Sequence, residues 1–166
     1  MAEEWLKHLV HEVKEKDRAP AEATARFNHE QKIIESDGPV LWRSFADFLG
    51  KYVEEMRVDF SDDITLREGK LSFSQQSTQI SIGKAAFPCV AFAATPNYQQ
   101  RIAQIFYSSV NPRPPHPQGA PSINMPCRFE VRQQDKVFLQ LDGKPFHEAH
   151  EAAKYIIEKL FTIHPA

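Results

Sequence analysis

Two groups of the form His-x-x-His-Glu carry side chains that can bind metal ions. One group is formed by His8, His11 and Glu12, and the other by His147, His150 and Glu151. In a helix, residues three or four apart project to the same side, so His147 could share a zinc ion with His150 or Glu151. Both groups fall on the polar faces of expected amphipathic helices, where His and Glu are common solvent-facing residues. We therefore expect exposed helix surfaces and no metal or other cofactor.

Other residues typical of active sites also have simpler explanations. Asp59, Asp62 and Asp63 could hold a hard cation or act as acid and base, but aspartate also suits the turn expected there. Cys89 and Cys127 lie in apolar surroundings, which indicates buried thiols. The six glycines are scattered, so no phosphate-binding loop is present, and no G-x-S-x-G motif occurs. The sequence identifies no catalytic residue and favours a non-enzymatic protein.

The segment from Gly69 to Phe129 has no Asp or Glu in 61 residues, where the chain average of 22 acidic residues in 166 would give about eight. Its cations are Lys70, Lys84, Arg101, Arg113 and Arg128. The segment is otherwise rich in Gln, Ser and Asn. Interface cores are depleted of charge in this way, so we expect a surface that another chain covers. Burial of the central strands is the alternative explanation, since it also leaves few positions for charge.

The contacts of this surface are expected from exposed strand residues and from a proline-rich loop at 111–126. The strand residues are Ser72, Ser74, Gln79 and Ser81, and the loop residues are Pro112, Pro114, Pro115 and Pro117. The prolines form two P-x-x-P patterns, which partner grooves bind because polyproline is already extended. As a structural alternative, the loop covers the sheet. We predict a protein-interaction or regulatory domain that self-associates, since homodimers are the commonest assemblies.

An alternative function is the binding of a small anionic molecule, or an unrecognised enzyme activity, in a pocket under the proline-rich loop. Arg101, Arg113 and Arg128 are the cations available for such a ligand, because an acid-free wall with arginines attracts a carboxylate or phosphate. The two functions differ in geometry. Arginines that converge in a concave site would favour the ligand, whereas scattered arginines on a flat sheet would favour the interaction surface.

Whole-chain properties restrict the partners further. The net charge of −2 and the dispersed cations make nucleic acid an unexpected partner. No apolar run reaches the roughly 18 residues of a membrane span, and the N-terminus lacks the basic and apolar regions of a signal peptide. Two cysteines make no disulfide framework. We therefore expect a cytoplasmic protein, without a membrane partner, that binds itself or another protein.

The elements that position these residues begin with a helical arm at residues 1–36. Its apolar stripe at helical spacing consists of Trp5, Leu6, Leu9, Val10 and Val13. This stripe could pack on the chain's own domain or on a neighbour, and Pro20 is expected to break the arm. An α+β domain at residues 37–166 follows. It opens with a helix of four turns from Val40 to Met56, with Pro39 at the first helical position.

After Arg57 the apolar pattern changes to a period of two, which predicts an antiparallel sheet of about five to six strands. Strands are expected between Val58 and Gly83, at 87–94 and at 127–141, with a helix at Tyr98–Phe106 and a C-terminal helix from Pro145. This order predicts an α+β fold with helices packed on one sheet face. It resembles the element order of small secretion chaperones, which dimerise, and the resemblance rests on element order alone.

Overall fold

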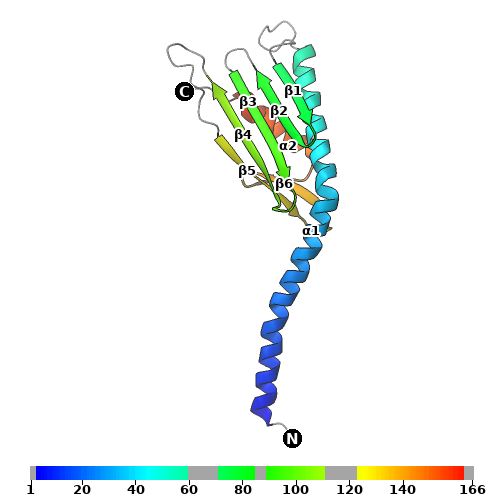
Figure 1. Cartoon of the computed structure of the whole chain (residues 1–166), viewed down its shortest axis with the longest axis vertical. Coiled ribbons are helices and arrows are strands. Elements are labelled where there is room, and N and C mark those ends of the chain that lie inside the picture. The colour runs from blue at the N-terminus through cyan, green and yellow to red at the C-terminus, as the bar shows by residue number, and fades with distance from the viewer. Residues whose placement is uncertain (1–2, 60–70, 85–88, 111–122, 163–166) are drawn as a thin grey trace.

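The structure, a computed structural model, describes residues 3–59, 71–84, 89–110 and 123–162. Within them the chain forms a long helix, seven strands and a second helix (Figure 1). The helices are α1 (Glu4–Asp59) and α2 (Ala149–Thr162). The strands are β1 (Leu71–Gln76), β2 (Gln79–Lys84), β3 (Cys89–Asn97), β4 (Ile102–Val110), β5 (Ile123–Val131), β6 (Val137–Leu141) and β7 (Lys144–Phe146).

The strands form one antiparallel sheet in chain order, with β1 at one edge and β7 at the other. The predicted α+β class, with an antiparallel sheet, helices on one face and an N-terminal helical extension, is confirmed. The number of strands is seven rather than five to six. One additional strand is β7, which follows a two-residue turn at Asp142 and Gly143. Both turn residues have positive φ angles, 52° and 78°, as the favoured hairpin turns require.

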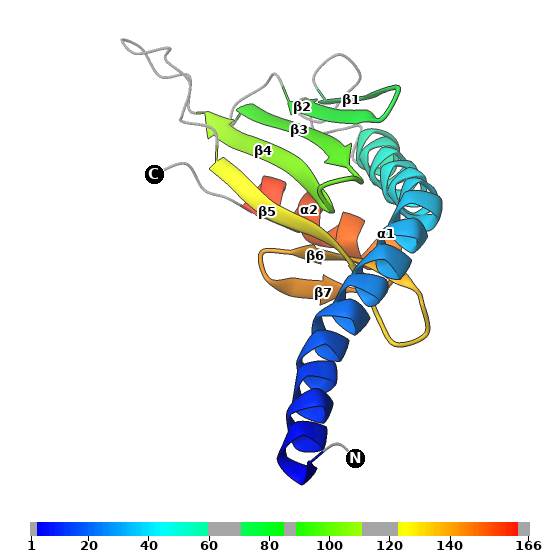
Figure 2. The same cartoon turned by 60° about the horizontal axis from the view of Figure 1, so that its bottom comes forward.

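Both helices cover the same face of the sheet and share one core with it (Figure 2). The centre of this core is Trp42 of α1, which is 2% exposed. Its ring contacts Phe45 and Phe129 at centroid distances of 5.2 and 6.0 Å, and its Nε1 donates a hydrogen bond to the Thr78 carbonyl at 2.7 Å. The indole is thus buried with its polar group satisfied, which fixes the position of α1 on the sheet.

Two glycines of α1 allow rings from the sheet side to approach the helix closely. A Cβ atom on Gly38 would lie 2.9 Å from Cδ1 of Tyr98, and one on Gly50 would lie 2.9 Å from Cε1 of Phe73. Such distances are shorter than van der Waals contact. The helix backbone is therefore pressed against the sheet at two points three turns apart.

The predicted break of the first helix is wrong, because α1 continues through Pro20 and through Pro39. A proline removes one backbone hydrogen bond, but alanines surround Pro20 and favour the helix. An ion pair also spans this turn, with Arg18 Nε 2.8 Å from Glu22 Oε1. Figure 2 shows α1 curving along its length. The boundary between the predicted arm and domain, at 36–37, falls inside this continuous helix.

The helix predicted at Tyr98–Phe106 is also wrong, because β4 begins at Ile102. The apolar residues fit both a helical and an alternating pattern. The structure has the alternating pattern, since Ala103, Ile105 and Tyr107 are buried while Phe106 between them is exposed. Aromatic and β-branched side chains favour strands in such a half-buried setting. The element order on which the resemblance to secretion chaperones rests is therefore not the observed one.

Element ends differ from expectation at three further places. Val58, predicted in a strand, lies in the last turn of α1. Pro126, predicted in the irregular loop, lies in β5 just before the pairing with β6 begins at Cys127, where a residue without an N–H group is tolerated. Pro145 lies in β7, and α2 begins only at Ala149. Asp62 and Asp63, and the predicted strand residues near them, lie outside the described residues.

Candidate interaction surface

One face of the sheet is packed under α1 and α2, whereas no helix of the described chain covers the opposite face (Figure 2). We call this second surface the open sheet face. None of the side chains that the described parts of β1–β4 direct to it is charged. They include Ser72, Ser74, Gln76, Gln79, Ser81, Ala91, Ala93, Thr95, Gln104, Phe106 and Ser108. The acid-free segment of the sequence therefore forms an uncharged surface of small and amide side chains.

A row of cross-strand neighbours runs over the middle of the open sheet face. Its members are Ser74, Ser81, Ala93, Phe106 and Asn124. The β1–β3 part of this row consists of serine and alanine, whose short side chains project little from the sheet. The larger Phe106 ring projects beyond them and is 42% exposed. An exposed aromatic ring beside small uncharged residues is typical of contact surfaces.

Beside Phe106 the open sheet face contains a shallow hollow of about 130 Å³. Ala91, Ala93 and Ser108 line it together with Phe106. The hollow exists because the small side chains of β3 face an aromatic ring and a serine on β4. Its size suits one apolar side chain of a partner rather than a drug-sized ligand, which needs roughly 300 Å³ or more.

The first part of α1 extends past the end of the sheet (Figure 1). We call residues 4–26 the projecting arm. The predicted apolar stripe lies on it and is exposed throughout, with Trp5 at 63%, Leu9 at 48% and Val13 at 50%. An isolated helix with an uncovered apolar stripe is marginally stable in water. The arm therefore has a surface that association would cover.

The turn between β3 and β4 holds α1 at the place where the arm leaves the sheet. Arg101 donates from Nε to Gln31 Oε1 at 2.8 Å and from Nη2 to the Phe27 carbonyl at 2.6 Å. Its Nη1 also pairs with Glu30 at 3.3 Å, and its guanidinium lies 3.9 Å from the centroid of the Phe27 ring. Gln31 donates in turn to the Tyr98 carbonyl at 2.9 Å. These bonds set the direction of the projecting arm.

A second contact links the same part of α1 to the turn between β5 and β6. Nε2 of His29 lies 3.2 Å from Oδ2 of Asp135, and both side chains are 61% exposed. Exposed ion pairs contribute little to stability. Arg101 is therefore the main anchor of the arm, and His29 adds a weaker one.

The four predicted strand contacts lie together on the open sheet face. Ser74 faces Ser81, and Ser72 donates a hydrogen bond to the Gly83 carbonyl at 3.3 Å. Gln79 closes the β1–β2 hairpin opposite Gln76. The predicted loop contacts, Pro112, Pro114, Pro115 and Pro117, lie outside the described residues.

The predicted arginines serve separate parts of the molecule. Arg101 is engaged with α1, whereas Arg128 lies on the outward side of β5 with Nε 3.4 Å from Oε1 of Glu130. Arg113 lies outside the described residues. The Arg101 and Arg128 side chains are thus each paired with a carboxylate, that of Glu30 and that of Glu130, and this arrangement gives the anionic-ligand hypothesis no support.

The predicted metal-binding histidines have different aromatic neighbours. His147 precedes α2 and its ring lies 4.9 Å from that of Phe138, whereas His150 lies on α2 with its ring 5.7 Å from that of Phe48. Glu151 is exposed on α2. In the parts of the chain that the structure describes, no three His, Cys, Asp or Glu residues are grouped so as to hold a metal ion.

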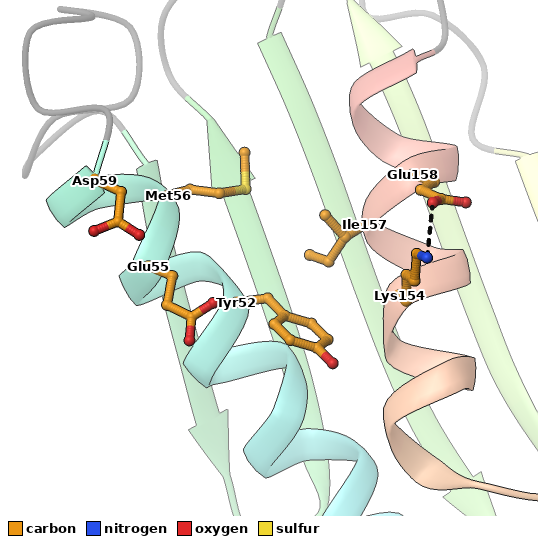
Figure 3. Close-up of a pocket in the computed structure, with 7 residues that line it drawn as sticks. All are labelled: Tyr52, Glu55, Met56, Asp59, Lys154, Ile157 and Glu158. Carbon is orange, nitrogen blue, oxygen red and sulfur yellow. Dashed lines mark ion pairs between the residues drawn. The ribbon is translucent and has the colours of Figure 1, made fainter.

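A groove of about 350 Å³ lies between the last turns of α1 and α2 (Figure 3). Tyr52, Met56 and Ile157 supply its apolar lining, and carboxylates stand on its rim. One of them, Glu158, lies 3.9 Å from the Lys154 ammonium. A mainly acidic rim does not attract the carboxylate or phosphate that the alternative function requires.

The two cysteines differ in their surroundings. Cys127 is buried, as predicted, and burial raises the pKa of its thiol to about 12. Cys89 is only half-buried at the end of β3. A thiol with so high a pKa is protonated at neutral pH, so Cys127 is unsuited to nucleophilic catalysis.

Some residues of this surface were not singled out in the sequence. Phe106 was assigned to a helix, so its exposed position went unnoticed, and Ala91 and Ala93 were read as part of a buried strand. The alternation of small with large residues in β3 would have revealed an outward face. For Arg101, the sequence contains no signal of its contact with α1, because its partners lie about 70 positions away.

No helix among the described residues is both long enough and apolar enough to cross a membrane. Comparison with known protein families, with curated proteins and with solved structures found no match to this chain.

Proposed function

We propose that this protein is a non-enzymatic interaction or regulatory domain that self-associates through the open sheet face. The observation that carries the proposal is the composition of that face, which has no charged side chain at the described outward positions of β1–β4. A solvated sheet face normally carries charged and polar residues in alternation with the core. A face built from Ser, Ala and Gln around an exposed phenylalanine is instead suited to being covered.

The proposed partner is a second copy of the chain. The uncharged β1–β4 part of this face meets a copy of itself, or another uncharged surface of that copy, without the like-charge repulsion that suppresses self-association. Closed dimers are also the commonest assemblies of soluble proteins. The buried Cys127 and the half-buried Cys89 fit a reducing compartment, and we infer a cytoplasmic location.

The test is a charge placed on the open sheet face. Ser81→Glu puts a carboxylate in the middle row of the face, where a covered interface would have to desolvate it. We expect the dimer dissociation constant, measured by sedimentation equilibrium, to rise about 30-fold or more, equivalent to roughly 2 kcal/mol.

The matched control is Ser36→Glu, which adds the same charge at an exposed position of α1. Position 36 is two residues, or roughly 200°, around the helix from the buried Ile34, so it faces away from the sheet. This variant should dimerise like the unaltered chain. Equal dissociation constants for the two variants, with both folded by circular dichroism, would remove the open sheet face as the interface.

A further inference from the structure

The projecting arm and the open sheet face look in the same direction. Phe27 shows this, because the Arg101 guanidinium from the end of the sheet lies on its ring. Leu9 is 18 residues before Phe27, about five full turns, and therefore lies on the same side of α1. The apolar stripe of the arm therefore points from α1 toward the side on which the sheet lies. The open sheet face is the surface of the sheet that points away from α1. The stripe and the open sheet face thus point in the same direction.

The arm also repeats the pattern with which α1 packs on its own sheet. In the packed half, an aromatic residue, a leucine and a valine follow one another at intervals of four, as Phe45, Leu49 and Val53. In the arm the same sequence of types at the same intervals is Trp5, Leu9 and Val13. The first set is buried on a sheet and the second is exposed, so the arm presents a ridge of a kind that fits a sheet surface.

The projecting arm, whose outer part carries the apolar stripe, and the strands of the sheet have similar lengths. The projecting arm is about 35 Å long, from about 23 residues at 1.5 Å each. The longest strands, β3, β4 and β5, have 9 residues each and are about 30 Å long. Figure 1 shows the strands running roughly along α1, so an arm laid on the sheet in the opposite direction would follow the strands over their whole length.

We propose that two copies form an antiparallel dimer in which the projecting arm of each copy packs its apolar stripe on the open sheet face of the other. A two-fold rotation reverses both the direction of α1 and the direction of the open sheet face. It therefore places the arm of each copy on the open sheet face of the other copy. A helix and a sheet pack about 10 Å apart, so the two sheets then lie in one layer between the two long helices. The inference rests on the proposed function and names the segment that covers the face.

Pairing of the arms with one another explains less of the molecule. If the two arms paired in parallel, stripe against stripe, the sheets of the two copies would overlap, because each sheet lies on the stripe side of its own α1. An antiparallel pair of arms would leave the open sheet face uncovered. The proposed contact covers both surfaces, and two helix footprints of about 35 by 10 Å give roughly 1,400 Å² over both partners, within the range of stable interfaces.

The contact is also compatible with the charges beside the stripe. Glu12 borders it on the arm, and Lys16 and Asp17 follow the stripe on the same side of the helix. No carboxylate lies at the described outward positions of β1–β4, so Glu12 meets no like charge there. In this contact Trp5 and Leu9 reach the far end of the partner's face, near the hollow between Ala91 and Ser108.

The test is site-directed cross-linking between two differently tagged full-length variants, both carrying Cys89→Ser. One carries Leu9→Cys and the other Ala91→Cys, and a short bismaleimide reagent joins thiols that lie close together. Cys127 remains, because it is buried and its thiol is protonated at neutral pH. The control arm variant is His11→Cys, two residues and roughly 200° around the helix from Leu9.

We expect the mixture of Leu9→Cys and Ala91→Cys to give a cross-linked heterodimer at about tenfold or more the yield of the His11→Cys control, because the contact raises the effective thiol concentration. Links within the Leu9→Cys variant alone would mean that arms pair with arms, and links within the Ala91→Cys variant alone that the faces meet directly. Either result overturns the inference, and the second leaves the proposed function standing. No link in a sample that sediments as a dimer also overturns it, whereas a sample that sediments as a monomer overturns both.

Discussion

At the scale of single residues, Arg101 has the largest structural role that the described contacts reveal. One side chain joins the β3–β4 turn to three residues near the base of the arm, Phe27, Glu30 and Gln31, through two short hydrogen bonds, an ion pair and a cation–π contact. Its side chain is only 17% exposed, so these interactions are partly shielded from water. Hydrogen bonds of charged groups under such conditions contribute more than exposed ion pairs.

Replacement of Arg101 should therefore weaken the fold and release the arm. We expect Arg101→Ala to lower the free energy of unfolding by about 2 kcal/mol, measured by chemical denaturation, and to speed hydrogen exchange at the base of the arm. The matched control is Arg128→Ala, which removes an exposed arginine paired with Glu130 and should cost less than about 0.5 kcal/mol. Equal effects of the two substitutions would show that Arg101 is not an anchor.

The pH dependence at the alkaline end should come from two groups. Burial raises the pKa of Cys127 from 9.0 to about 12, and burial together with the hydrogen bond to Asp142 raises that of Tyr155 from 10.0 to about 12. The folded state holds these protons more tightly than the unfolded chain. Stability is therefore full below pH 9 and falls between about pH 9 and 12.

The loss from Cys127 alone should reach roughly 4 kcal/mol at the upper end of this range. Thermal unfolding followed from pH 8 to 11 checks the sign and the slope. Cys127→Ala should flatten the slope relative to the unaltered chain, and Tyr155→Phe should flatten it further. A stability that stays constant or rises over this range would contradict the assigned burial of the thiol.

At the scale of elements, the long helix is the feature that the sequence predicted least well. The sequence predicts a break at Pro20 and the start of a new helix at Pro39, whereas the helix continues through both. Around Pro39 the surrounding residues are held by packing against the sheet, with Ile34 and Trp42 buried on either side. Around Pro20 only local propensity and the Arg18–Glu22 pair support the helix.

This difference predicts different effects of removing the two prolines. Pro20→Ala should increase the helical circular dichroism signal of the dilute protein, because a proline inside an unpacked helix costs about 3 kcal/mol relative to alanine. Pro39→Ala, the control, should leave the signal nearly unchanged, since that segment is already fixed by tertiary contacts. An unchanged signal in Pro20→Ala would mean that the arm is already fully helical with proline at position 20.

The spacing of apolar residues alone did not decide between a helix and a strand for β4. Residues 98, 102, 105 and 106 fit a helical repeat, yet the buried set in the sheet is Ala103, Ile105 and Tyr107. The choice between the two patterns depends on the neighbouring strands, because Ala103 pairs with Pro96 and Cys127. Strands whose turns carried clear signals, such as β6, were predicted correctly.

At the scale of the whole molecule, the α+β class and the single-sided packing of the helices followed from composition and periodicity. The open sheet face was predictable only in part: Ser72, Ser74, Gln79 and Ser81 lie on it, but its central ring, Phe106, was missed. Which residues of an acid-free segment point outward depends on strand register, and register is set by pairing that a single sequence does not specify. The same holds for the contacts of Arg101 with α1.

The large-scale consequence is a molecule with two uncovered surfaces. The open sheet face and the stripe of the projecting arm both lack a partner in the described chain, and both face the same side of α1. A monomer would expose the apolar stripe together with the Phe106 ring, which is unfavourable in water. Association of two copies removes both from water.

Self-association can be measured by sedimentation equilibrium of the unaltered, full-length chain over a wide concentration range. We predict a mass that rises to twice the 19.0 kDa of the chain at micromolar concentration, with no larger species. A mass that remains at 19.0 kDa at every concentration would contradict self-association through the open sheet face.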